Sequence, residues 1–201
     1  MSKKRFDDLL ERVTLGPAPA LWPPYNAEHD LAHELLAISP EQLFDEPITQ
    51  PDLAACTVAG LLLFADCLAE SHHISQSIAS STGSYWHAIM HRREPDYSNA
   101  RYWFNRVGQH EAFSKVYTES LHALDQLETA ESDKLKAQIG AWGQWNPEGF
   151  IELCELAYTK NAGHRPALEA VQKAEMTTLL KWCHENATQG KPSADTITTG
   201  A

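Results

Sequence analysis

Residues 51–78 read P-D-L-A-A-C-T-V-A-G-L-L-L-F-A-D-C-L-A-E-S-H-H-I-S-Q-S-I and form the most apolar stretch of the chain. Through Leu68 the apolar side chains surround the expected helix on nearly every side, which is typical of a helix buried on all faces. Elsewhere apolar residues recur with a period of 3.6 residues, whereas no segment sustains an alternation of apolar and polar residues with a period of two. We therefore predict an all-α, single-domain, orthogonal or antiparallel bundle of about eight helices, with the central buried helix near residues 51–78.

The length of the chain sets its domain organisation. A chain of 201 residues is long enough for one domain with a substantial core, and a second full domain is not expected. Residues 1–187 are predicted to form that helical domain. The remaining residues, 188–201, are small, polar and interrupted by Pro and Gly, which predicts a disordered tail.

Charge and cysteine usage narrow the class of protein. The net charge of -11 argues against nucleic acid or an anionic membrane as a partner, because binding to phosphates needs a broad basic surface. The four cysteines are widely spaced with no C-x-x-C motif, as expected in a reducing compartment. No apolar run is long enough to cross a bilayer, and the N-terminus lacks the apolar core of a signal peptide. We expect a soluble cytoplasmic protein, and the sequence leaves its oligomeric state open.

Polar, charged and aromatic side chains are concentrated between Tyr85 and Gly108, which read Y-W-H-A-I-M-H-R-R-E-P-D-Y-S-N-A-R-Y-W-F-N-R-V-G. Pro95 cannot continue a helix, so one helix should end near residue 93 or 94. Asp96 or Ser98 can then cap a second helix, which Gly108 can end. The stretch therefore predicts a tight pair of helices that carries a site.

Two polar stripes follow the helical period on either side of the turn at residues 80–84. Three residues on the second helix, His87, His91 and Glu94, are spaced i, i+4 and i+7. The preceding helix has the same spacing, in Asp66, Glu70 and His73. Because a short link makes the two helices antiparallel neighbours, we expect the stripes to face each other. The adjacent His72 competes with His73, since it belongs to the same E-S-H-H run but points to another face.

The segment from Glu70 to Gly108 resembles a family of uncharacterised bacterial and fungal proteins. The resemblance is carried by E-S-H and by Y-W-H-x-I-M-H-R-R-E followed by N-A-x-Y-W-F-x-R-V-G, with weaker similarity between Trp145 and Glu155. It implies that the site lies in this segment, and it implies no reaction.

The chemistry of the site is predicted from its residue types. The sequence contains no phosphate-binding loop, no dinucleotide-binding glycine motif, no G-x-S-x-G and no H-E-x-x-H. What remains is a set of imidazoles and carboxylates on adjoining helices, the arrangement with which helical bundles bind metals. Mixed ligation of this kind favours Zn, Fe or Mn. The predicted metal ligands are Asp66, Glu70, His73, His87, His91 and Glu94.

The leading hypothesis is a metal-dependent enzyme of hydrolase or oxygenase type that acts on a small anionic substrate. Four of the seven arginines lie between residues 92 and 106, which suits a small anion in a pocket. We predict that Arg93, Arg101, Arg106 and Trp103 bind this substrate. The predicted catalytic residues are His87, His91 and Glu70.

Three other interpretations remain open. Without a metal, His87 or His91 would act as an acid or base that Glu70 orients. In a non-catalytic binding module, the aromatic and Arg-rich face would hold a protein or a small anionic ligand. The same groups would otherwise form a buried polar network with a structural role. Glu175 lies within the apolar stripe of the last helix, so it should pair with an Arg or His of the central segment.

Overall fold

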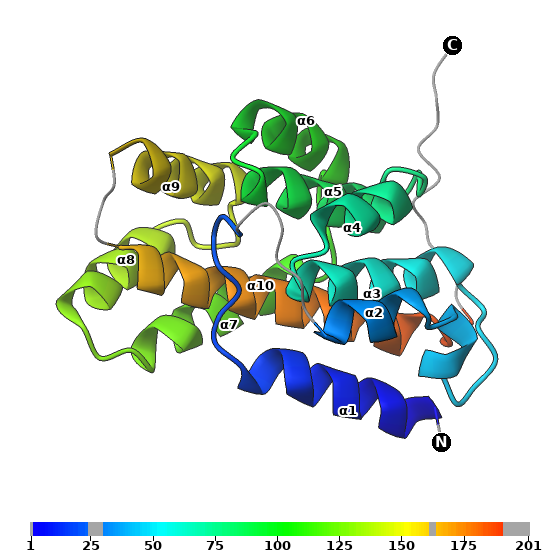
Figure 1. Cartoon of the computed structure of the whole chain (residues 1–201). Coiled ribbons are helices and arrows are strands. Elements are labelled where there is room, and N and C mark those ends of the chain that lie inside the picture. The colour runs from blue at the N-terminus through cyan, green and yellow to red at the C-terminus, as the bar shows by residue number, and fades with distance from the viewer. Residues whose placement is uncertain (1, 24–29, 161–163, 191–201) are drawn as a thin grey trace, which may run out of the picture.

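The computed structural model describes residues 2–23, 30–160 and 164–190, and in these residues all regular structure is helical (Figure 1). This confirms the all-α prediction, although ten α-helices and one 3₁₀ helix exceed the eight expected. The predicted tail falls largely on residues 191–201, which lie outside the described residues, so its disorder and the domain boundary stay predictions. The helices are α1 (Ser2–Leu15), α2 (Asp30–Leu36), η1 (Pro40–Leu43), α3 (Pro51–Phe64), α4 (Leu68–Ser75), α5 (Ser81–Arg93), α6 (Tyr97–Val107), α7 (Phe113–Asp125), α8 (Ala130–Gly140), α9 (Pro147–Lys160) and α10 (Arg165–Asn186).

The core is built around α3, α5 and α10. Most residues of α3 are buried, as its apolar sequence predicts, and α5 is buried along its whole length. The longest helix, α10, packs against both α3 and α7 (Figure 1). None of the described helices is long and apolar enough to span a membrane.

The predicted central helix over residues 51–78 is wrong in one respect, because the structure divides it into α3 and α4. The chain breaks at Asp66, whose φ of 57° lies in the left-handed region. The guanidinium of Arg93 explains the break, since it donates at 2.5 Å both to Asp66 Oδ1 and to the carbonyl of Leu63 in the last turn of α3. Arg93 thus adds a charged donor to a carbonyl at the end of α3 that otherwise accepts a longer hydrogen bond, at 3.3 Å, from the N–H of Asp66.

The pair of helices around Pro95 is confirmed. The first helix of the pair, α5, ends at Arg93, and α6 begins at Tyr97. Asp96 is the N-cap of α6, with Oδ1 accepting a hydrogen bond from the backbone N–H of Asn99 at 3.2 Å. Gly108 follows α6 with a φ of 62°, a conformation that glycine adopts without strain.

A buried ion pair joins α5 to α10, as predicted for Glu175. Arg92 Nη2 lies 2.5 Å from Glu175 Oε2, and both side chains are almost completely buried. The hydroxyl of Tyr85 donates to the other carboxylate oxygen at 3.0 Å. The guanidinium carbon of Arg92 lies 4.5 Å from the centre of the Phe150 ring. The carboxylate is therefore compensated by one charge and one hydroxyl.

Candidate metal centre

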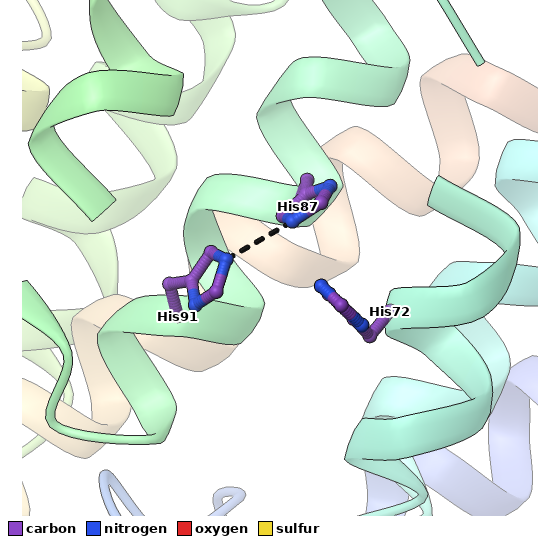
Figure 2. A group of neighbouring side chains, drawn as sticks. All are labelled: His72, His87 and His91. Carbon is purple, nitrogen blue, oxygen red and sulfur yellow. Dashed lines mark hydrogen bonds between the residues drawn. The ribbon is translucent and has the colours of Figure 1, made fainter. Parts of the chain in front are cut away.

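Three histidines from two neighbouring helices converge on one point. His87 and His91 lie one turn apart on α5, and His72 faces them from α4 (Figure 2). The Nε2 atoms of His87 and His91 are 3.0 Å apart. One nitrogen from each of the three rings lies within 4.8 Å of the other two.

The short connection between α4 and α5 brings these rings together. Ser80 caps α5 by accepting a hydrogen bond from the N–H of Gly83 at 3.1 Å. A Cβ at Gly83 would lie 2.4 Å from the carbonyl oxygen of Ile78, so only glycine allows the chain to approach α5 this closely. On its other side α4 is fixed to α3, because the hydroxyl of Ser71 donates to the carbonyl of Ala59 at 2.9 Å. These contacts hold the His72 ring 4.6 Å, between centroids, from that of His87.

Burial keeps the two α5 histidines neutral. Burial, followed by the neighbouring His91 and His72, lowers the pKa of His87 to about 3. Burial also lowers the pKa of His91, although Glu94 and Asp96 oppose that effect. Because both rings are neutral at pH 7, one Nε2 donates and the other accepts across the 3.0 Å contact. Neutral imidazole is also the form that binds metals.

The spacing of the three nitrogens suits a tetrahedral metal ion. Zinc–nitrogen bonds of about 2.0–2.1 Å place two tetrahedral ligands about 3.3 Å apart. The His87 and His91 nitrogens are already near that separation, at 3.0 Å. His72 is only partly buried, and its nitrogen lies within 4.8 Å of the other two. Three imidazoles would leave a fourth position for water or substrate.

Glu94 and Trp103 surround this three-histidine group. Glu94 Oε2 lies at ion-pair distance from His91 Nδ1, 3.3 Å, although Nδ1 forms no hydrogen bond among the described residues; the charge of the carboxylate increases the basicity of the ring. The Trp103 ring stacks on His87, with centroids 4.0 Å apart and an angle of 18° between the planes. The Arg106 guanidinium lies 5.3 Å from the centre of the Trp103 ring. One side of the group is therefore aromatic, and the other carries a carboxylate.

The structure brings together only part of the predicted ligand set. His87, His91 and Glu94 are adjacent as expected, but the third imidazole is that of His72, and His73 is exposed. Two predicted carboxylates lie outside the three-histidine group: Glu70 is exposed, and Asp66 pairs with Arg93. The break between α3 and α4 explains the difference. It interrupts the stripe that a continuous helix would have carried from Asp66 to His73.

Most of the predicted anion-binding arginines are engaged elsewhere. Arg93 is completely buried and bonds Asp66 and two backbone carbonyls, those of Leu63 and Ala20. Arg101 pairs with Glu148 and Glu155, each at 2.6 Å. Arg106 is exposed and has no carboxylate at ion-pair distance in the described part of the chain. It is the member of the predicted set best placed to meet an anion.

The sequence predicted His72 only as a competitor of His73, and the E-S-H-H run was the pattern that indicated it.

Comparisons with known proteins assign no family and no function to the chain. No family model matches the chain, and no curated protein and no solved structure gives a match. The resemblance to uncharacterised proteins stays a prediction, and inference about function rests on the geometry of the three histidines.

Proposed function

We propose that the protein binds a divalent transition metal, Zn²⁺ foremost, through His72, His87 and His91. The observation that carries this proposal is the convergence of three imidazole nitrogens within 4.8 Å from two adjacent helices. A ligand set of imidazoles suits Zn, Cu, Ni or Fe, whereas Mn prefers oxygen ligands. The absence of a carboxylate from the three-histidine group of described residues also separates it from the two-His, one-carboxylate centres of iron oxygenases.

A hydrolytic reaction is the chemistry that this ligand set favours. Zinc held by three protein ligands lowers the pKa of a bound water to about 7 and so supplies hydroxide near neutral pH. In this chain Glu94 would orient His91, and Trp103 would exclude solvent from the face of His87. Access would come from the side of His72, the most exposed of the three rings. We propose a small anionic substrate, for which Arg106 is the available cation.

Metal binding is tested by titrating Zn²⁺ and Co²⁺ into untagged, metal-free protein, with calorimetry and the visible Co²⁺ spectrum as readouts. The variants His72→Ala and His91→Ala should each weaken binding by about 100-fold or more, since each removes one of three ligands. The matched control is His73→Ala, which removes the neighbouring exposed imidazole and should leave binding unchanged. Equal losses in the His72 and His73 variants, or no binding by the wild-type protein, would refute the proposal.

Hydrolysis is tested separately with the zinc-loaded protein. We expect cleavage of an activated ester or phosphate, such as p-nitrophenyl acetate or p-nitrophenyl phosphate, with a rate that rises through the pKa of the bound water near pH 7. The His73→Ala variant should retain this rate and His91→Ala should lose it. If the zinc-loaded protein hydrolysed these substrates no faster than free Zn²⁺ at the same concentration, the hydrolytic function would be refuted and only the metal site would stand.

A binding module is the second candidate, and one observation favours it. Tyr102 is 55% exposed and lies edge-on to Trp103, with Arg106 over both rings. Exposed Tyr, Trp and Arg side chains are the residues most often found at the centre of protein interfaces. This candidate predicts that Tyr102→Ala abolishes partner capture while leaving Zn²⁺ affinity unchanged, so the metal titration separates the two functions.

A further inference from the structure

A groove between α7 and α10 lies outside the three-histidine group and is lined by more cationic than anionic side chains. It encloses about 540 Å³, which is within the range of small-molecule sites. Three lysines line it: Lys115 from α7, and Lys173 and Lys181 from α10. Glu119 is the one carboxylate among its described lining residues. The groove is thus locally cationic in a chain whose net charge is -11.

The helical period explains why these lysines meet. Lys173, Thr177 and Lys181 are spaced i, i+4 and i+8 on one face of α10. Lys115 and Glu119 occupy consecutive turns of α7, which packs directly against α10. Two stripes that are distant in the sequence therefore form two walls of the groove, and Thr14 of α1 and Ala18 also line it.

The ammonium groups have few partners inside the protein. Neither Lys115 nor Lys181 has a carboxylate at ion-pair distance among the described residues. Lys173 donates to the carbonyl of Gly16 at 2.7 Å, and partial burial lowers its pKa. A concave surface with two unpaired ammonium groups attracts anions, because its low-dielectric walls focus the field.

The apolar part of the lining, here called the floor, consists mostly of alanines. Ala123 contributes from α7, Leu127 from the residues that follow α7, and Ala170 and Ala174 from α10. Small residues leave depth between the two helices, and their methyl groups offer apolar contact. A ligand with only a charged group would leave this floor exposed, so the groove suits an anion that also has an apolar body.

We propose that the α7–α10 groove binds a small amphipathic anion, specifically a medium-chain carboxylate whose acyl chain lies on the alanine floor and whose carboxylate meets Lys115, Lys173 and Lys181. The hydroxyl of Thr177 is placed between two of these lysines along α10, where it can donate to the same carboxylate. An extended anionic membrane is a poorer occupant, because the net negative charge of the chain repels it.

The test uses octanoate and the metal-free full-length protein in EDTA, so its result does not depend on the proposed metal centre. Calorimetry should detect binding of octanoate. Butyrate, which has less apolar surface, and octanol, which has no charge, should each bind more weakly than octanoate. The double variant Lys115→Gln/Lys181→Gln should weaken octanoate binding by about tenfold. The matched control, Lys134→Gln/Lys160→Gln, removes the same charge from exposed positions on α8 and α9 and should leave the affinity for octanoate unchanged.

A steric variant separates the groove from general charge effects. Ala174→Leu fills the floor without changing any charge and should also weaken octanoate binding by about tenfold, with circular dichroism confirming that the variant is folded. Equal octanoate affinity in the groove variants and the wild type would overturn the proposal. So would a loss confined to the control pair, octanol binding as tightly as octanoate, or no octanoate binding at millimolar concentration.

Discussion

Replacing Glu175 with Gln removes the carboxylate that faces the buried guanidinium of Arg92. The two side chains are 0% and 1% exposed, with N and O atoms 2.5 Å apart. Nε and Nη1 of Arg92 have no hydrogen-bond partner among the described residues, so the charge would be left mainly with the face of Phe150. Breaking a buried pair in this way costs about 3–5 kcal/mol. We expect about 3 kcal/mol for Glu175→Gln, because the amide oxygen can still accept a hydrogen bond.

Urea unfolding at pH 7, followed by far-ultraviolet circular dichroism, measures this cost. The double variant Arg92→Met/Glu175→Gln should be less destabilised than the sum of its single variants, because it removes both members of the pair. Glu155→Gln is the control, since it breaks the solvent-exposed pair with Arg101 and should cost less than about 1 kcal/mol. If the Glu175 and Glu155 variants lost the same stability, the buried pair would not have the role assigned to it.

Three further predictions follow from burial, packing and the arrangement around the three-histidine group. Burial lowers the pKa of His110 to about 4, so below pH 6.5 this residue binds fewer protons in the folded state than in the unfolded state. His110 should contribute about 3 kcal/mol to the loss of stability between pH 6.5 and 4, in addition to the contribution of His87, whose pKa is also lowered. The variant His110→Gln should remove only the His110 contribution in urea unfolding. Gly60→Ala should cost about 1–3 kcal/mol, because its Cβ would lie 2.6 Å from the buried ring of Trp86. By contrast, a Cβ at Gly140 would meet no other atom within 4 Å, so Gly140→Ala should raise the temperature of thermal unfolding slightly. Glu94→Gln should weaken Zn²⁺ binding by about 10- to 100-fold in calorimetry, and an unchanged affinity would show that the carboxylate does not act on the ligand.

The helical class and the main helix ends were predictable because local chemistry determines them. Pro95 ended α5 and Asp96 capped α6 through groups within a few residues of each boundary. Pairing of Glu175 was also predictable in kind, since a carboxylate within an apolar stripe requires a partner. Its specific partner, Arg92, lies 83 residues away, and only the packing of α5 on α10 selects it.

Local chemistry did not allow us to predict which histidine of α4, His72 or His73, faces α5. A continuous helix over residues 51–78 would have placed His73 in line with Asp66, but the chain breaks at Asp66 and begins α4 with a new rotation. At that break Asp66 bonds Arg93, which is 27 residues away in the sequence. Local periodicity contains no information about such a contact, and it therefore predicted His73 where the structure places His72 beside His87 and His91.

The structural network and the proposed metal centre are parts of one arrangement. Arg92 fixes α5 to α10, and the next residue, Arg93, fixes it to the junction of α3 and α4. Neither ion pair involves His87 or His91, which meet His72 of α4 (Figure 2). The pair formed by Arg93 also stabilises the break that sets the rotation of α4, and hence which histidine faces α5. A metal site needs its ligands held in place by packed surroundings, and the two buried arginines would provide that support for the proposed site.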